Sequence, residues 1–307
     1  MSDLLLAFSN SLTALALCIV VGFVCRRKFI LTDVHTSGLA ELLVKVAMPS
    51  TVFISLMRPF SNELMIESLL TFFITGFIYI IGGYVGLIVS KLMKATNGER
   101  ECWQFGIAFG NVGFMGIPVV MAVFGEAGLI YVSMAAASFS LLSFTLGVRM
   151  FDKAPKGIHI LGLLKNSPAI PATAVGFLFF LTGLRLPSPL EGGIEIISGM
   201  TTPLSMILIG AILAKQKLKE SLTDLRVLPP TFVKLVFVPL AVFFVLQFFI
   251  ENRLMLSVIV TLMAMPPAAA TAIFAERYEG DAVAAAKFVV VPTILCVVTV
   301  PLIAILF

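Results

Sequence analysis

Long apolar runs separated by short polar stretches dominate the pattern along the chain. A helix that crosses a bilayer needs about 20 mostly apolar residues, and the chain offers a succession of runs of that kind. We place the predicted helices at residues 4–24, 36–57, 64–92, 103–124, 127–151, 167–185, 190–214, 229–250, 254–275 and 283–306. The pattern therefore predicts an all-α membrane protein with ten transmembrane helices and no domain outside the membrane.

Composition points the same way. Hydrophobic residues make up 59% of the chain and charged residues only 12%, with a mean hydropathy of +1.08. In a soluble domain about a quarter of the residues are charged, so soluble and disordered classes of protein are excluded. The four cysteines form no CxxC pair, and we expect no disulfide, metal site or cofactor. The net charge of +4 lies in short loops, which argues against a nucleic-acid partner.

The orientation follows from the basic residues between the predicted helices. The even-numbered loops hold only Arg58, Arg185 and Arg253. The odd-numbered loops hold Arg26, Arg27, Lys28, Lys91, Lys94, Arg100, Arg149, Lys153, Lys156, Lys165, Lys215, Lys217, Lys219, Arg226 and Arg277. Because basic loops stay in the cytoplasm, we expect the odd loops there, both termini outside, and the chain in the cell membrane. The first run is expected to be a retained helix, since its basic residues follow it.

Small and helix-breaking residues recur at a nearly constant separation. Pro49 corresponds to Pro203, Asn111 to Pro266, and Gly125 to Gly280. This spacing predicts two homologous halves of five helices, residues 1–151 and 152–307. Five is odd, so the second half would enter from the opposite side and form an inverted repeat. Chance coincidence is the alternative, because proline is common in membrane helices.

Two predicted helices are poor continuous helices. The fourth contains three glycines, an asparagine and a proline within residues 110–118, and the ninth contains two consecutive prolines. Proline removes a backbone donor and clashes with the preceding turn, so both helices should break at a matching depth and cross. The residues expected at these breaks are Asn111, Gly113, Gly116, Pro118, Met265, Pro266, Pro267 and Ala268.

The point where the two broken helices cross is a predicted anion-binding site. Unpaired backbone groups cost several kcal/mol each in hydrocarbon, so a break is tolerated where it is buried or lines a wet cavity. Helix N-termini carry roughly half a positive charge and would point at the crossing. The Asn111 side chain could donate to a carboxylate or cap a half-helix. A packing kink without a ligand is the alternative.

Charged residues inside the predicted helices are few. Glu41 and Lys45 lie four apart, in the order that favours a helical ion pair. Coupling to protons would require a buried carboxylate, and Glu67 and Glu41 are the candidates. Lys234 could meet either an anionic substrate or a helix C-terminus. Enzyme motifs such as HExxH, GxSxG and a P-loop are absent from the sequence, so we expect a secondary transporter rather than an enzyme.

The sequence resembles the auxin efflux carrier family, whose bacterial branch is often labelled malate or malonate permeases. The residues that carry the resemblance are Asn111-Val112-Gly113-Phe114-Met115-Gly116-Ile117-Pro118, Met265-Pro266-Pro267-Ala268, Pro203-Leu204 with Gly210-Ala211, and Arg277-Tyr278 with Gly280-Asp281. The similarity runs along essentially the whole chain. The long cytoplasmic loop of the plant carriers is missing, so auxin itself is not the expected substrate.

The resemblance implies the ten-helix inverted repeat with crossed helices four and nine. It also implies a scaffold of helices one, two, six and seven, and a transport domain of helices three to five and eight to ten. The transport domain would carry the site across the bilayer in an elevator-like step, within a homodimer.

These observations together predict a secondary carrier for a small organic anion such as malate, with H+ or Na+ as the coupling ion. The alternative is a sodium- or proton-coupled cation or solute carrier of a related crossed-helix fold. Antiporters of that kind usually need a buried carboxylate beside the break, and the sequence around Asn111 and Pro266 has none.

Overall fold

The computed structural model describes residues 2–151, 168–215, 218–304 and 306. Every regular element in these ranges is a helix, and extended backbone pairs there in an isolated bridge between Gly110 and Pro267. The predicted all-α class is therefore confirmed. The join between the two predicted halves lies within residues 152–167, outside the described part of the chain.

Six helical stretches in the described ranges are long and apolar enough to cross a membrane. They are Asp33–Leu56, Asn62–Leu92, Val112–Met150, Ser188–Lys215, Leu225–Leu246 and Ala282–Ala304. Ile170–Thr182 and Arg253–Met263 are shorter apolar helices. Val112–Met150 covers parts of two predicted helices, because helical structure continues across a kink at Gly125 (φ 64°, ψ −161°). The protein is thus a multi-pass membrane protein, and the count of ten stays a prediction.

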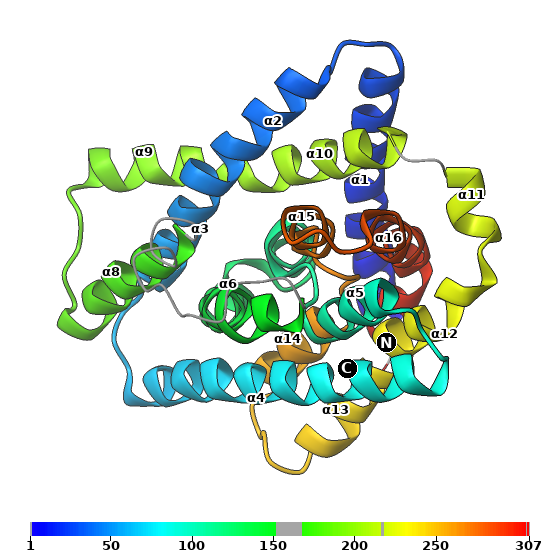
Figure 1. Cartoon of the computed structure of the whole chain (residues 1–307). Helices are drawn as coiled ribbons and strands as arrows, with labels where there is room; N and C mark the ends of the chain where they lie inside the picture. Colours follow the sequence, from blue (N-terminus) through cyan, green and yellow to red (C-terminus); the bar gives the residue numbers. More distant parts are fainter. Residues whose placement is uncertain (1, 152–167, 216–217, 305, 307) are drawn as a thin grey trace. The chain divides into compact units, whose positions relative to one another are not determined.

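The chain forms two compact units, each assembled from segments that are distant in the sequence (Figure 1). The first unit comprises Met1–Phe72, Gly113–Ser140 and Ile160–Lys215. Its elements are α1 (Ser2–Arg27), α2 (Asp33–Leu42), η1 (Leu43–Ala47), α3 (Met48–Leu56), the start of α4 (Asn62–Leu92), most of η2 (Val112–Gly116) and of α6 (Ile117–Leu142), α8 (Ala169–Thr182), α9 (Ser188–Gly199) and α10 (Thr201–Lys215).

The second unit comprises Phe73–Val112, Leu141–His159 and Gln216–Phe307. Its elements are the rest of α4, α5 (Asn97–Ala108), η3 (Ser143–Gly147), η4 (Val148–Met150), α11 (Leu218–Thr223), η5 (Leu225–Val227), α12 (Leu228–Phe232), η6 (Val233–Phe237), α13 (Val238–Leu246), α14 (Arg253–Met263), α15 (Ala270–Arg277) and α16 (Ala282–Ala304).

In the first unit, α1 and α10 approach each other closely at two glycines. A Cβ atom on Gly22 would overlap the carbonyl of Ile207, and one on Gly210 would overlap the carbonyl of Ile19. Lipid tails are as apolar as the helices, so association in a bilayer depends on close backbone packing, and small residues allow it. These glycines therefore hold the two helices together.

A second contact region of the first unit surrounds α3. The Phe53 ring meets the Phe179 ring of α8 edge-on, with centroids 5.3 Å apart. The Thr51 hydroxyl lies 2.8 Å from the Thr201 hydroxyl, and the Ser55 hydroxyl lies 2.6 Å from that of Ser133. Buried hydroxyls need such partners because water is excluded, so these pairs fix how α3 is rotated against its neighbours.

In the second unit, α4 lies against α5 through a small-residue stripe (Figure 1). A Cβ atom on Gly82 would stand 2.9 Å from the Cα of Ala108, and one on Gly86 would stand 2.6 Å from the Cα of Gln104. The spacing of four residues on both helices places each pair one turn apart. Aromatic rings fill the other side of α5, where Phe105 contacts Phe109, Phe151 and Phe274.

Three of the four π-helical turns in the described ranges come just before a proline. The turns η1, η2 and η6 are followed by Pro49, Pro118 and Pro239, each at the second residue of the next α-helix. Proline lacks the N–H that the preceding turn would use, and its ring crowds that turn. A wider turn relieves this clash, so the sequence explains where these turns occur.

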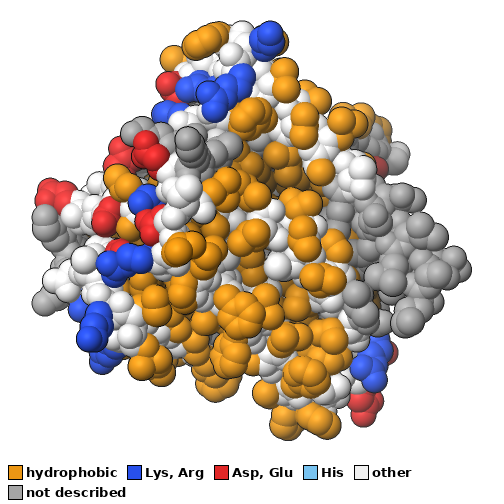
Figure 2. All heavy atoms as spheres, turned by 90° about the vertical axis from the view of Figure 1, so that its right-hand side faces the viewer, with side chains coloured by type: hydrophobic (Ala, Val, Ile, Leu, Met, Phe, Trp, Pro, Cys, Tyr) orange, Lys and Arg blue, Asp and Glu red, His pale blue; other side chains and the backbone are white. Residues whose placement is uncertain are grey.

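The surface carries many exposed apolar side chains, among them Phe73, Phe77, Phe248 and Phe249. Figure 2 shows hydrophobic side chains over most of one face, with Lys and Arg gathered toward its margins. Soluble proteins rarely expose contiguous apolar areas of this extent, whereas lipid tails would solvate them. The surface is therefore that of a membrane protein.

The first prediction concerns the α1–α10 contact. Gly210→Ala should lower the melting temperature of the detergent-solubilised protein, because the added methyl group pushes against the Ile19 carbonyl and overpacking costs about 1–3 kcal/mol. Gly38→Ala in α2 is the matched control, since a Cβ there meets nothing within 4 Å. Equal shifts for the two variants would show that the helices do not approach as described.

Candidate functional site at two paired helix breaks

The first break follows α5. This helix begins with a capping box, in which the Glu99 N–H donates to the Thr96 hydroxyl (3.3 Å) and the Thr96 N–H donates to the Glu99 carboxylate (2.9 Å). It ends at Ala108, and Phe109 is extended (φ −105°, ψ 101°). Helical structure resumes at Val112. Gly110 and Asn111 favour the interruption, because glycine is a weak helix former and asparagine competes for backbone groups.

The second break follows α14. The Asn252 side chain caps the start of this helix by accepting from the Met255 N–H at 3.1 Å. The helix ends at Met263, and α15 begins only at Ala270. Pro266 and Pro267 lie between them, and each disfavours helical geometry at the residue before it. The two prolines thus account for the length of the break.

The two breaks pair with each other inside the second unit. We call residues 109–111 and 264–269 the paired linkers. The Asn111 N–H donates to the Pro266 carbonyl (2.7 Å), and the Ala268 N–H donates to the Phe109 carbonyl (3.0 Å). Phe109, Asn111, Met265 and Ala268 are all buried. Each linker therefore satisfies backbone groups of the other, as buried chain in a bilayer must.

Lys234 lies beside the paired linkers. Its side chain, on η6, is fully buried, and its Nζ donates to the Ile107 carbonyl in the last turn of α5 (3.3 Å). A Cβ on Gly110 would stand 3.2 Å from this Nζ and from the Leu262 carbonyl oxygen. Helix C-termini carry partial negative charge, so the ammonium compensates the end of α5. Of the two predicted roles of Lys234, the helix C-terminus is the one that the contacts show.

The start of α15 is the positive helix end at the second linker. The Thr271 N–H donates to Ala268 and the Ala272 N–H to Ala269, in a tight first turn. The Thr271 hydroxyl is buried and has no hydrogen-bond partner among the described residues. A buried hydroxyl without a partner is costly, and a polar ligand at the linkers would relieve that cost.

The remaining predicted site residues belong to the first unit. Gly113 and Gly116 lie in η2 and Pro118 in the first turn of α6, where Gly113 faces the end of the Met48 side chain. Glu67 accepts a hydrogen bond from the Tyr131 hydroxyl at 2.7 Å.

Glu41 forms the predicted ion pair with Lys45, and both side chains are 61% exposed. Both candidate coupling carboxylates therefore stand outside the paired linkers, and only Glu67 has a partner in a partly buried setting.

One ion pair lies at the other end of α5, and a second joins α16 to the residue before η5. The Arg226 guanidinium donates to Glu99 (3.0 Å), and the Lys287 ammonium donates to Asp224 (2.7 Å). The Lys287 ammonium holds the pKa of the Asp224 carboxyl below its usual value, and the Arg226 backbone N–H contributes in the same direction. Sequence patterns did not reveal these pairs, because the partners are far apart along the chain.

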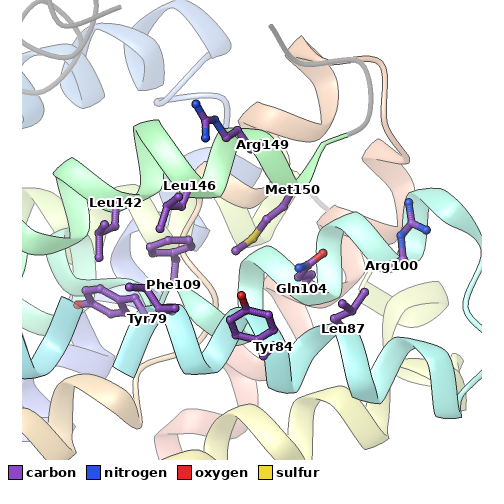
Figure 3. A pocket seen from close by; sticks show the side chains of 12 residues that line it. Tyr79, Tyr84, Leu87, Arg100, Gln104, Phe109, Leu142, Leu146, Arg149 and Met150 are labelled. Carbon is purple, nitrogen blue, oxygen red and sulfur yellow. The ribbon is translucent and has the colours of Figure 1, made fainter. Parts of the chain in front are cut away.

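A cavity of about 340 Å³ adjoins the first linker in the second unit (Figure 3). Phe109 forms part of its wall, together with side chains from α4, α5 and the η3–η4 stretch. Two arginines, Arg100 and Arg149, also line it. The sequence signalled this cavity only weakly, through the cluster Gly82, Gly83 and Gly86 on α4.

A family model described as membrane transport protein matches residues 7–162 and 160–304. The chain belongs to this family. It is the auxin efflux carrier family, which the motifs around Asn111 and Pro266 indicated, so that prediction is confirmed.

Individual relatives are similar along most of their length. An "Uncharacterized transporter" of Methanothermobacter thermautotrophicus is 26% identical over 303 residues, covering 96% of each chain. The "Uncharacterized transporter YfdV" of Escherichia coli K12 is 21% identical, over 89% of this chain and 88% of the relative. A Rhizobium meliloti protein named "Putative malonate transporter" is 23% identical, covering 85% and 84%. Membrane transport is thus the shared description.

The second prediction concerns the space at Gly110. Gly110→Ala should lower the melting temperature in detergent more than Gly113→Ala does. The first methyl group meets two backbone carbonyl oxygens and the Lys234 ammonium at 3.2–3.3 Å, whereas the second meets only the Met48 side-chain end. A flexible side chain can move aside, but paired backbone cannot. A larger loss at Gly113 would contradict the described pairing.

Proposed function

We propose that the protein is a secondary carrier that binds a small organic anion of the malate or malonate type at the paired linkers. Membership of the membrane transport family supports the transport part of this proposal. The name of the Rhizobium meliloti relative supports a small dicarboxylate as the substrate class. We propose the cell membrane as its location, with both termini external, and no catalytic role.

The hydrogen-bond donors at the linkers favour an anion as the ligand. The N-terminus of α15 carries partial positive charge, although its Thr271 and Ala272 amides already donate within the first turn. The Thr271 hydroxyl in that turn has no partner among the described residues and can donate to a ligand. The linkers themselves contain no Asp or Glu, so no fixed negative charge opposes a carboxylate. Asn111 adds a side-chain amide that can donate to the same ligand.

Lys234 supports an anion over the alternative of a cation carrier. A cation site at crossed helix breaks would use the carbonyl oxygens at the helix C-termini. Here the Lys234 ammonium already bonds the Ile107 carbonyl at the end of α5. That carbonyl is therefore already engaged and does not offer itself to a second cation.

We further propose a ten-helix inverted repeat with crossed helices four and nine that works by an elevator-like step in a homodimer. The division into two compact units supports this. Each unit takes segments from both halves of the chain, and the second unit contains both linkers and Lys234. A binding site within one unit can move as one piece. Residues 113–140 are part of the predicted transport domain but belong to the first unit.

The third prediction tests the site. Wild-type protein in liposomes should take up labelled malonate or malate under an imposed gradient. Thr271→Val and Asn111→Ala should each reduce uptake by roughly tenfold or more, because a hydrogen bond to a charged group is worth about 1.5–3 kcal/mol. Thr299→Val is the matched control, since its hydroxyl oxygen is also buried without a partner but lies in α16, away from the linkers.

Two results would count against the proposal. If wild-type protein moves no organic anion under any gradient, the proposed function is wrong. If uptake occurs but Thr271→Val and Asn111→Ala match Thr299→Val, the carrier binds its substrate elsewhere.

The fourth prediction concerns coupling, for which we propose Glu67 with Tyr131. Glu67→Gln keeps the shape of the side chain but removes the carboxyl group that could exchange a proton. Uptake driven by a pH gradient should therefore fall severalfold, while anion exchange at equal pH on both sides persists. Glu41→Gln should change neither, because Glu41 is exposed and paired with Lys45. Unchanged pH-driven uptake in Glu67→Gln would exclude this residue as the coupling group.

A further inference from the structure

The cavity beside the first linker has its own chemistry, separate from the linkers. It lies between α4, α5 and the η3–η4 stretch, all within the second unit. Its volume of about 340 Å³ is in the range of small-ligand sites. The proposed transport mechanism makes no use of its polar side chains, so the cavity needs a separate account.

The cavity has a mostly apolar lining with two arginines at different margins (Figure 3). Tyr79, Phe109 and Leu142 line the apolar end, on the left in Figure 3. Arg149 and Arg100 lie toward the upper and right-hand margins, with Gln104 nearby. Arg100 lies in the first turn of α5, and Phe109 directly follows the end of this helix. At 1.5 Å per residue, the two are roughly 13 Å apart along the helix axis.

The cavity reaches the apolar surface of the protein. Tyr84 and Leu146 both line it and are 65% and 38% exposed, respectively. Both lie within the long apolar stretches that cross the membrane. A ligand with an apolar chain can therefore enter sideways from the bilayer while its polar end stays level with the arginines.

Glycine on α4 creates the space. A Cβ atom on Gly83 would stand 2.7 Å from the terminal methyl group of Met150, so any larger residue at this position would push that side chain into the cavity. Gly82 and Gly86 draw α4 close to α5, which leaves the remaining gap on the η3–η4 side. Hence the cavity follows from the same glycine cluster that packs the two helices.

We propose that this cavity binds an anionic amphiphile, namely a membrane phospholipid whose acidic headgroup lies between Arg100 and Arg149 and whose chain follows Tyr84 toward Phe109. Guanidinium groups suit phosphate because they can donate two parallel hydrogen bonds to it. Arginines at the level of the headgroups attract acidic lipids in the same leaflet. A small hydrophilic anion would leave the aromatic and aliphatic end of the cavity unfilled, so it fits this cavity less well than a phospholipid does.

The position suggests the consequence of binding. Phe109 belongs both to the cavity wall and to the paired linkers, where its carbonyl accepts from the Ala268 N–H. A chain packed against Phe109 would restrain the first linker. Lipid binding should therefore stabilise the second unit and the linkers together.

The experiment uses the delipidated full chain in a neutral detergent, with bound lipid counted by native mass spectrometry. The probes are dioleoyl phosphatidylglycerol, dioleoyl phosphatidylcholine and glycerol 3-phosphate. We expect phosphatidylglycerol to bind at least about tenfold more tightly than phosphatidylcholine, and this preference to vanish in the double variant Arg100→Gln/Arg149→Gln. Lys91→Gln/Lys94→Gln removes two cations of the same region outside the cavity lining and should keep the preference.

A second variant tests the apolar end. Leu142→Trp fills that end without touching either arginine and should weaken phosphatidylglycerol binding while the protein stays monodisperse. Equal binding of the two lipids, or equal losses in the two double variants, would overturn the proposal. If glycerol 3-phosphate binds as tightly as phosphatidylglycerol, the site recognises a free phosphate, and the acyl-chain part is wrong. Because uptake of organic anions is not the readout, these outcomes are independent of the proposed substrate.

Discussion

Backbone hydrogen bonding without water is the constraint on which the rest of this structure depends. Two helices stop inside the apolar part of the chain, and each break would leave amides and carbonyls unpaired. The linkers meet as a short antiparallel pair, in which Asn111 donates to Pro266 and Ala268 donates to Phe109. Pro266 and Pro267 bring no donors of their own, so they can occupy the pair without leaving an N–H unsatisfied. The pairing allows a non-helical region at a depth where a single broken helix would be unstable.

The pairing also brings helix ends of opposite partial charge together. It brings together the C-terminal ends of α5 and α14, which are negative, and the N-terminal end of α15, which is positive. The chain supplies its own cation for the negative ends, the buried ammonium of Lys234. The positive end keeps a buried hydroxyl, that of Thr271, without a partner among the described residues. The partial positive charge and the free hydroxyl proton that remain for a solute to complement are the reason why we propose an anion rather than a metal ion as the ligand.

The helical class, the membrane setting and the family could be predicted because they depend on composition and local sequence. Gly110, Asn111, Pro266 and Pro267 act on their own turns, so the ends of α5 and α14 follow from neighbouring residues. The position of Lys234 could not be predicted, since its contact with Ile107 joins residues of different helices. The same holds for Thr51 with Thr201 and for Arg226 with Glu99. The joint at Gly125 was predicted, since the fourth predicted helix ends at residue 124 and the fifth begins at 127, and glycine adopts the φ of 64° found there at little cost.

The π-helical turns have an evolutionary consequence. Such a turn holds one residue more than an α-helical turn, and so it resembles a single-residue insertion within an older, regular helix. Losing one residue from η6 would rotate everything beyond it by about 100°, and the apolar face of α13 would turn with it. A lineage that shortened this stretch would therefore have to repack α13 against its neighbours at the same time.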